Sequence, residues 1–319
     1  MSQKLAIGID LGGTQLRVAL VDGGAVVRRA AARTDVEGGP GGVLHQVEKL
    51  ITEICAEEER KTLLGVGISC PGPLDTETGT VLHIPTLPRW EGFPLRQTLA
   101  DKLRLPVLLE NDGIAAAFGE WRFGAGRGLQ HLVYVTVSTG IGGGVIVDGR
   151  LLHGRRGMAA HVGHFRMAQD GPTCTCGATA CFEAFASGTA LGRRAREAAE
   201  RSPSEFLGRL AAETPIEARH VEEGARTGDA ACLALLHEEG VFLGQGFTGL
   251  IHLYSPERLI MGGGVSQAFD LLEPEIHSVI QRDAIHPFKD VRVVRAALGD
   301  NSGLIGAAAL AMEHAGRTS

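Results

Sequence analysis

The sequence lacks the features that define several classes of protein. It has no run of 18 apolar residues, the length that a membrane-spanning helix needs, and no Gly-X-Y repeat of the collagen type. Acidic residues outnumber basic ones by 37 to 31, so the net charge is -6 and no basic stripe suits nucleic acid or an anionic membrane. The opening residues MSQKLAIGIDLGGT resemble neither a secretory signal nor a transit peptide. We therefore expect a globular cytoplasmic protein with no nucleic-acid or membrane partner.

Glycine, in contrast, is abundant. The 319 residues include 45 glycines but only 13 prolines, and 44% of the residues are hydrophobic. This composition does not fit a flexible linker, and it favours a folded protein whose backbone turns tightly around a ligand. The length is sufficient for two lobes.

Strand and helix patterns alternate along the chain, which predicts mostly parallel sheets with flanking helices. In the first half the expected strands are 5–10, 16–21, 63–70 and 106–110, and the expected helices are 43–59, 94–103 and 113–122. In the second half we expect strands in 132–149, at 258–262 and at 291–297, and helices at 183–200, 203–212, 230–253 and from 303.

An internal repeat relates the two halves. Residues 132–149, LVYVTVSTGIGGGVIVDG, align with residues 6–23, AIGIDLGGTQLRVALVDG, as strand, glycine turn and strand. This repeat predicts a duplicated α/β fold with a cleft between two lobes. We place the boundary near residue 112: residues 1–112 form a small lobe, completed by the helix 303–319, and residues 113–302 form a large lobe.

Glycine clusters follow three of the predicted strands. Their backbone N–H groups and neighbouring hydroxyls suit phosphate oxygens, and Asp10 suits a hydrated Mg²⁺. One such cluster alone is equally well explained as a hairpin turn, but two of them together predict a clamp for a polyphosphate. The third cluster suits a flat adenine ring. The clusters comprise Asp10, Gly12, Gly13 and Thr14; Ser138, Thr139, Gly140, Gly142 and Gly143; and Gly262, Gly263 and Gly264.

Polar residues follow the predicted strand 106–110, where ligands bind in open α/β sheets. Asp112 has two interpretations there. It can cap the helix that begins at Gly113, which is the slightly favoured interpretation of the position alone. Alternatively, if the glycine clusters hold a phosphate donor, Asp112 can accept the proton of an alcohol that receives the phosphate.

Three of the six cysteines lie close together, after a histidine. His164, Cys174, Cys176 and Cys181 can close a tetrahedral structural Zn²⁺ site, although the C-x-C spacing is tighter than in zinc fingers. The alternative is a loop with three free thiols. A metal in this loop would hold the nearby Glu183 rigidly. Cys55, Cys70 and Cys232 are most simply buried small residues, so we expect no disulfide framework.

Together these motifs resemble the ROK family of bacterial sugar kinases and repressors. The resemblance extends over nearly the whole chain, from IGIDLGGT through LENDGIAAAFGE, CTCGATACFEAFASGTAL and MGGGV to GLIGAAALA. It implies a duplicated actin-like ATPase (ribonuclease H-like) fold. It also implies an ATP-dependent, glucokinase-like kinase of hexoses with Mg²⁺ and a structural Zn²⁺, and a homodimer, with a tetramer as the alternative.

The resemblance also implies roles for individual residues. Asp112 matches the general base, and Asn111, Asp112, His161, His164 and Glu183 match sugar contacts. The first two glycine clusters match phosphate-binding motifs, and Gly263 and Gly264 match the nucleotide-side motif. His164, Cys174, Cys176 and Cys181 match the zinc ligands.

Several residues depart from the family pattern. His161 stands where the family has Glu, Thr86 (in Pro85-Thr86-Leu87) where it often has Asn, and Ile114 where it often has Asn. Neutral imidazole accepts one hydrogen bond and donates one, whereas a carboxylate accepts two, so the sugar need not be glucose. An N-acetyl hexosamine or another polyol is the alternative. Gln15 stands where Lys is common, which removes a charge near the phosphates.

The main rival to a kinase is a non-catalytic sugar sensor or regulator. Repressors of the family carry a helix-turn-helix module ahead of the first glycine cluster. Here that cluster begins within ten residues of the start, so we expect no DNA-binding module. A kinase fold that binds sugar without catalysis is favoured by the departures from the family pattern at His161, Thr86 and Ile114. Asp112 and the two phosphate motifs favour an enzyme.

Overall fold

A five-stranded mixed sheet forms the framework of the first half of the chain. Its order is β3-β2-β1-β4-β7, with β1 antiparallel to β2, β2 antiparallel to β3, and β4 parallel to both β1 and β7. The strands are β1 (Leu5–Leu11), β2 (Gln15–Asp22), β3 (Ala25–Arg33), β4 (Val66–Cys70) and β7 (Val107–Asn111). Because tight glycine turns can join only antiparallel strands, the sheet is mixed where we expected mostly parallel pairing.

The second sheet repeats this strand order as β10-β9-β8-β11-β12, with β11 parallel to β8 and β12. Its strands are β8 (Leu132–Val137), β9 (Ile141–Val147), β10 (Arg150–Leu151), β11 (Arg258–Gly262) and β12 (Arg292–Arg295). The recurrence of one order in both halves agrees with the predicted duplication of an α/β fold. A separate two-stranded sheet pairs β5 (Leu74–Asp75) with β6 (Thr80–Val81).

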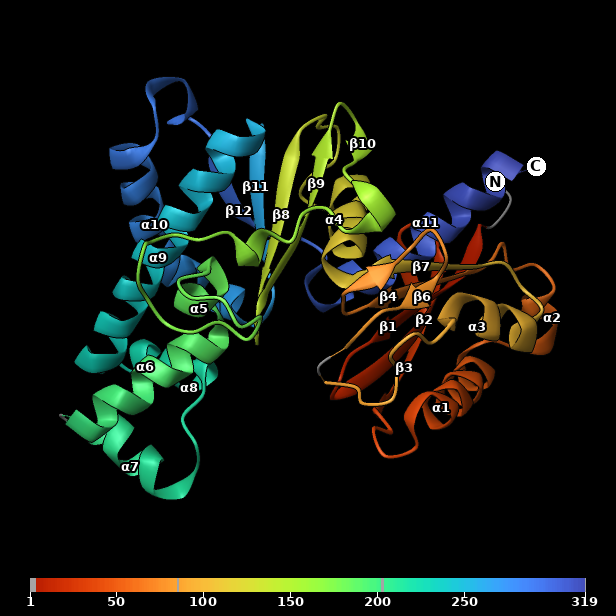
Figure 1. Ribbon diagram of the computed structural model, residues 1–319, viewed down its shortest axis with the longest axis horizontal. Helices are drawn as coiled ribbons and strands as arrows, with labels where there is room; N and C mark the ends of the chain where they lie inside the picture. The colour runs from red at the N-terminus through yellow and green to blue at the C-terminus, as the bar shows by residue number, and fades with distance from the viewer. Residues whose placement is uncertain (1–3, 85, 202–203, 319) are drawn as a thin grey trace. The chain divides into compact units, whose positions relative to one another are not determined.

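The computed structural model describes residues 4–84, 86–201 and 204–318, which divide into two compact units (Figure 1). Unit 1 comprises the residues up to 129, residues 144–160 and the residues from 297. Unit 2 comprises residues 130–143 and 161–296. In the described part of the chain, no helix has both the length and the apolar character to span a membrane.

Helices flank the sheets in both units. Unit 1 contains α1 (Gly39–Ile54), α2 (Glu57–Arg60), α3 (Leu95–Leu103), α4 (Asp112–Phe123) and α11 (Ser302–Thr318). Unit 2 contains α5 (Phe182–Ala186), α6 (Gly188–Arg201), α7 (Glu205–Glu213), α8 (Ala218–Arg226), α9 (Ala230–Tyr254) and α10 (Phe269–Asp283). The single helix expected at 183–200 is two helices, because the backbone at Ser187 is extended. Strand β3 and helices α8 and α10 were not predicted.

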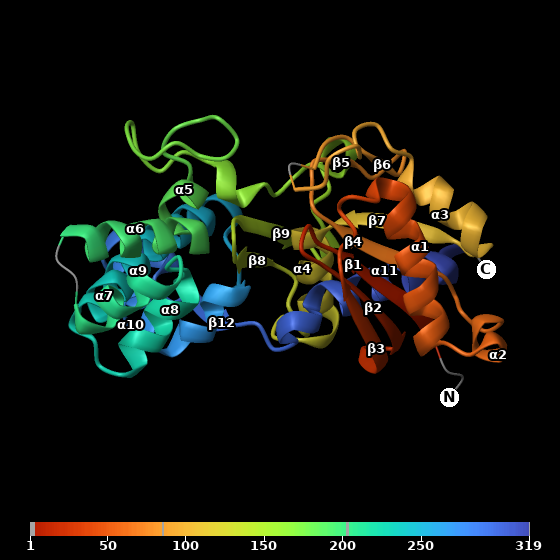
Figure 2. The ribbon, with the colours of Figure 1, turned by 90° about the horizontal axis from the view of Figure 1, so that it is seen from below.

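The sheet of unit 1 buries both faces, and strand β1 shows how. Its odd-numbered residues from Leu5 to Leu11 face a core shared with α1 and α3, whereas Ala6 belongs to a second core shared with α11. This division follows from the alternation of side chains along a strand. Figure 2 shows α1 and α3 on one side of the sheet and α11 on the other.

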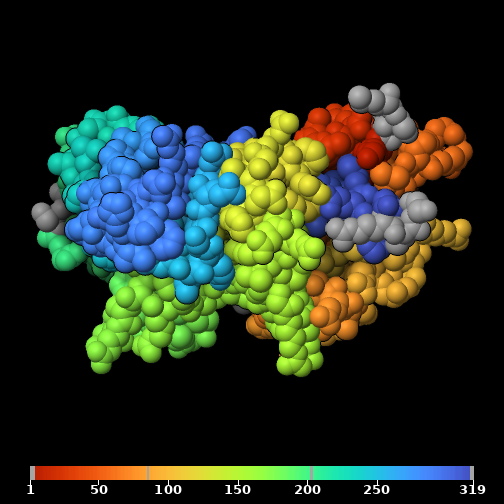
Figure 3. All heavy atoms as spheres, turned by 90° about the horizontal axis from the view of Figure 1, so that it is seen from above, coloured from red at the N-terminus to blue at the C-terminus, as the bar shows by residue number. Residues whose placement is uncertain are grey.

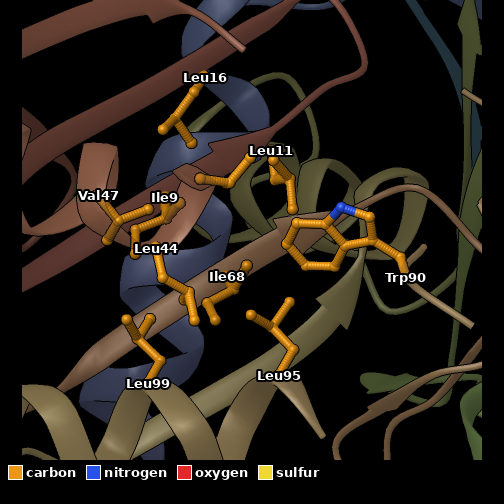
Figure 4. A pocket seen from close by; sticks show the side chains of 10 residues that line it. Ile9, Leu11, Leu16, Leu44, Val47, Ile68, Trp90, Leu95 and Leu99 are labelled. Atoms are coloured by element: carbon orange, nitrogen blue, oxygen red, sulfur yellow. The ribbon is translucent and has the colours of Figure 1, made fainter. Parts of the chain in front are cut away.

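The larger core of unit 1 contains a small gap of about 10 Å³ between β1, α1 and α3 (Figure 4). Its labelled lining is apolar: Ile9, Leu11, Leu16, Leu44, Val47, Ile68, Trp90, Leu95 and Leu99. A gap of this size between apolar side chains is a packing defect of the core, so the functional site lies elsewhere.

Helix α11 packs against bare backbone. A methyl group on Gly67 of β4 would lie 1.8 Å from the carbonyl oxygen of Ala307, and one on Gly8 of β1 would lie 2.1 Å from that of Leu304. A methyl group on Gly306 would lie 1.7 Å from the carbonyl oxygen of Ala115 in α4. In Figure 3, α11 in dark blue is flanked by the red N-terminal strands and by the yellow segment that includes α4. Part of the glycine excess therefore serves packing.

A buried carboxylate fastens the segment before α11 to α4. Glu120 is fully buried, and its Oε1 accepts hydrogen bonds from the Leu298 N–H at 2.8 Å and the Ser302 hydroxyl at 2.9 Å. Its Oε2 accepts from the Ala125 N–H at 2.8 Å and the Ala297 N–H at 3.1 Å. Four donors compensate the cost of burying this charge.

We expect Gly67→Ala to lower the free energy of unfolding by about 3 kcal/mol, because the methyl group forces α11 away from β4. Gly41→Ala is the matched control, since a methyl group at Gly41 in α1 would meet no atom within 4 Å. That variant should be as stable as the wild type or more stable by up to about 1 kcal/mol. Urea unfolding measures both, and an unchanged Gly67→Ala midpoint would contradict the packing described.

Candidate functional site

The first glycine turn, residues 10–14, joins β1 to β2 in unit 1. The N–H of Gly12 donates to the carbonyl oxygen of Gln15 at 3.0 Å, and the hydroxyl of Thr34 donates to the carbonyl of Gly12 at 2.7 Å. A methyl group on Gly13 would lie 2.6 Å from Cβ of Thr86, so Thr86 lies against the turn. Pro85, its neighbour in the sequence, lies outside the described residues.

Asp10 is the last residue but one of β1, and its carboxylate has two partners. Its Oδ2 lies 2.8 Å from Nη2 of Arg17, and its Oδ1 accepts a hydrogen bond from the Ser69 hydroxyl at 3.1 Å. Burial raises the pKa of the Asp10 carboxyl, although Arg17 acts in the opposite direction. Each oxygen keeps a further lone pair for a water of a hydrated Mg²⁺. Arg17, however, already compensates part of the charge that would attract the ion.

Asn111 and Asp112 lie where β7 ends and α4 begins. The Asn111 side chain caps the helix by accepting the Gly113 N–H at 3.0 Å, and Oδ1 of Asp112 accepts the same N–H at 2.8 Å. The cap function therefore falls to Asn111, and Asp112 is the first helical residue. Burial raises the pKa of the Asp112 carboxyl to about 6. Such a carboxyl group can gain and lose a proton near neutral pH.

The preceding residue, Glu110, forms a pair that sequence reasoning missed. Its buried carboxylate accepts the N–H of Asn111 at 2.8 Å and lies 2.9 Å from Nε2 of His153. This hydrogen bond raises the pKa of His153. No sequence motif joins two residues so far apart along the chain. Ile114, which stands where the family often has Asn, is only 1% exposed.

The second glycine turn, residues 138–143, joins β8 to β9. The N–H of Ser138 donates to the carbonyl of Gly140 at 2.9 Å, which closes the turn. From the junction of α5 and α6, the Gly188 N–H donates to the Ser138 carbonyl at 2.7 Å, and the Thr189 hydroxyl donates to the Thr139 carbonyl at 2.7 Å. The turn is therefore fixed from outside its own hairpin.

A cavity of about 500 Å³ in unit 2 brings two of the predicted clusters together. Ser138 and Thr139 of the second turn line it with Gly264, and Leu236, Val265 and Arg196 line it as well. Gly263 has a φ of 83°, and a methyl group on it would lie 2.4 Å from the carbonyl of Val137, so the third cluster packs closely on β8. The size and mixed lining suit a small organic ligand.

His164, Cys174, Cys176 and Cys181 converge in unit 2. One ligand atom of each lies within 4.8 Å of all the others. Sγ of Cys174 lies 3.7 Å from Nδ1 of His164, and Sγ of Cys176 lies 3.7 Å from Sγ of Cys181. In a tetrahedral zinc–thiolate site with bonds of about 2.3 Å, neighbouring sulfur atoms are about 3.8 Å apart. The four side chains therefore fit a tetrahedral ion.

Two further sugar-contact candidates of unit 2 lie near this His–Cys cluster. Glu183, in α5, contacts the Thr175 hydroxyl and the Ile141 N–H. The His161 and His164 rings are 6.3 Å apart. Burial, with a contribution from His164, lowers the pKa of His161, which favours the neutral imidazole at pH 7. Asn111 and Asp112, the other candidates, belong to unit 1.

Comparison with known proteins reveals relatives over the full length. The chain is 37% identical to the glucokinase of Thermotoga maritima over 99% of this chain and 100% of that protein. It is 30% identical to the xylose repressor of Caldicellulosiruptor bescii over 95% of this chain and 77% of that protein. The crystal structure of a ROK family glucokinase from Streptomyces griseus, in complex with glucose and AMPPNP, matches with a TM-score of 0.84 and 34% identity, over 97% of this chain and 99% of that one.

The structural match, with the repeated sheet order, defines an α/β protein of the duplicated actin-like ATPase fold, which confirms the fold class predicted from the sequence. The ROK family model matches residues 6–314. The chain belongs to the ROK family, and the resemblance found in the motifs is confirmed.

Proposed function

We propose that this chain is an ATP-dependent hexose kinase that transfers the γ-phosphate of ATP to a hydroxyl group of a glucose-like sugar. The observation that carries the proposal is the Asp112 carboxyl at the start of α4, with a pKa of about 6. The glucokinase relatives support the same activity, as do the two glycine turns.

In the reaction, Asp112 takes the proton of the attacking sugar hydroxyl. The hydroxyl oxygen forms a bond to the γ-phosphorus as the bond to the β–γ bridging oxygen breaks, and ADP leaves. Backbone N–H groups of the glycine turns and the hydroxyls of Thr14, Ser138 and Thr139 hold the phosphates. When bound, Mg²⁺ neutralises phosphate charge, and Asp10 would hold it through water. Gly263 and Gly264 would accommodate the nucleotide base.

The proposed sugar contacts are Asn111 of unit 1 and, in unit 2, His161, His164 and Glu183. His161 replaces a carboxylate of the family pattern, and its neutral ring offers one donor and one acceptor. Because of this exchange, an N-acetyl hexosamine is the alternative acceptor of the phosphate. A non-catalytic sugar sensor is the alternative function. The homodimer stays a prediction of the family resemblance, and the cytoplasmic location stays a prediction from the sequence.

A coupled assay of ADP release tests the activity, with glucose, mannose, fructose, allose and the N-acetyl hexosamines as acceptors. We expect turnover with at least one of these sugars. Absence of turnover with all of them, together with measurable sugar binding, would favour the sensor.

Asp112→Asn should lower kcat by about 10²–10⁴-fold while sugar affinity stays unchanged, because the amide keeps the shape but cannot accept the proton. The ADP-release assay measures the rate, and calorimetric titration measures sugar binding. Asp101→Asn, at an exposed position of α3, is the control and should keep full activity. Comparable rates in both variants would remove Asp112 from the role of base.

The pH dependence of the rate follows from the raised pKa of Asp112. The carboxylate is the active form of a base, so kcat/KM should be half its maximum near pH 6, level off about one pH unit above that, and approach a tenfold fall per pH unit on the acid side. The dependence of kcat/KM on pH, measured at saturating MgATP, tests this expectation. An Asp112→Glu variant separates the effect from titration of ATP, because only the enzyme's own midpoint should move with the substitution.

We also propose that His164, Cys174, Cys176 and Cys181 hold a structural zinc ion that orders the loop around them. The purified protein should contain about one zinc per chain, and Cys176→Ala should lose it, since three ligands bind much more weakly than four. Mass spectrometry of the metal content measures this. Cys55→Ala, a buried cysteine outside the cluster, should retain the zinc. Zinc-free wild type, or full occupancy in Cys176→Ala, would refute the assignment.

A further inference from the structure

Glu183 touches both the metal centre and the second glycine turn within unit 2. Its Oε1 accepts a hydrogen bond from the Thr175 hydroxyl at 2.7 Å and lies 3.5 Å from Sγ of Cys174. Its Oε2 accepts the N–H of Ile141, the residue after Gly140, at 2.9 Å. One carboxylate therefore spans the distance between the two features.

The contact with the turn is close. A methyl group on Gly140 would lie 2.4 Å from Oε2 of Glu183, so any other residue there would displace the carboxylate. The sequence suggested that Gly140 is glycine so that a phosphate can approach. The structure gives it a second reason, which is the approach of Glu183 to the same backbone.

Helix α5 provides a second connection. Its N-cap is Cys181, one of the metal-ligand candidates, and Glu183 lies in its first turn. The residues after the helix, Gly188 and Thr189, donate hydrogen bonds to the carbonyl groups of Ser138 and Thr139. The five-residue helix α5 thus lies between Cys181, a candidate metal ligand, and the residues that support the glycine turn.

Thr175 is held by the metal centre because it stands between Cys174 and Cys176. An ion that fixes both thiolates fixes the hydroxyl between them, and that hydroxyl directs Oε1 of Glu183. The other oxygen is then aimed at Ile141. Without the ion, the loop of residues 174–181 loses its common anchor, and the turn must be ordered at the moment a ligand binds, which weakens binding.

We propose that Thr175 and Glu183 are positioning residues through which the metal centre sets the conformation of the second glycine turn, so that zinc and nucleotide bind cooperatively. The inference rests on the proposed function of this turn in nucleotide binding. Because coupling between two ligands is reciprocal, each ligand must raise the affinity for the other by the same factor.

The first test compares Thr175→Val with the rescue variant Thr175→Ser and with the control Thr173→Val, an exposed threonine of the same loop. The dissociation constant of a fluorescent N-methylanthraniloyl ATP with excess Mg²⁺ is measured without sugar, and the zinc content is measured for every sample. Thr175→Val should retain zinc but bind the nucleotide about fivefold more weakly, the lower end of typical coupling. Thr175→Ser and Thr173→Val should match the wild type.

A zinc-loaded Thr175→Val chain with wild-type nucleotide affinity would overturn the inference. If instead the proposed function is wrong, the result differs, because zinc-loaded wild type would not bind the nucleotide at all.

The second test needs no variant and decides the matter if Thr175→Val loses its zinc. The zinc affinity of the wild type is measured by competition with a chelator, with and without MgADP. A parallel titration of the chelator with MgADP alone corrects for zinc held by the nucleotide. We expect MgADP to raise the zinc affinity about fivefold. An unchanged zinc affinity, with MgADP shown to be bound, would overturn the coupling.

Discussion

The contact of helix α11 with bare backbone is the constraint on which unit 1 depends. The helix lies so close to β1, β4 and α4 that a side chain at Gly8, Gly67 or Gly306 would collide with a carbonyl group. The contact also reaches the site, because a methyl group on Gly303 would lie 3.1 Å from Oγ of Ser69, the hydroxyl that binds Asp10. Helix α11, at the end of the chain, thus completes the core beneath Asp10, near its beginning.

Helix α4 transmits this constraint to the proposed base. Its first residue is Asp112, and two turns later Glu120 gathers four donors, three of them from the segment that leads into α11. Because buried charges tolerate little displacement, the Glu120 contacts fix the helix along its axis. The Asp112 carboxyl, whose burial raises its pKa, keeps a defined position for the same reason.

The two glycine turns occupy equivalent places in the two sheets but have different support. In unit 1 the neighbouring carboxylate is Asp10, which is paired with Arg17 and Ser69. In unit 2 it is Glu183, which binds Thr175 and the backbone of the turn itself. The duplication preserved the hairpin, whereas the surroundings diverged: among the described residues, a His–Cys cluster that could hold a metal lies beside only the second turn.

The sequence by itself determined the features that depend on neighbours in the chain. Glycine hairpins, the alternation of strands and helices, the Cys spacing and the position of Asp112 after a strand are all local patterns. Strand β3 escaped prediction because its run of Ala and Arg carries no apolar alternation, and α10 because Pro274 interrupts its helical pattern. Their structure comes from pairing with β2 and from packing on α9.

Only the tertiary structure decided which distant groups meet. No sequence motif predicts the pairs Glu110–His153 and Asp10–Ser69, the four hydrogen bonds to Glu120, or the contacts of Glu183 with Thr175 and Ile141. The reason for a given glycine is also visible only in the tertiary structure. Within its strand Gly67 has no distinguishing feature, but helix α11 from the end of the chain packs directly against it. Spacing along a chain specifies local geometry, but a contact between distant segments depends on the free energy of packing the whole unit.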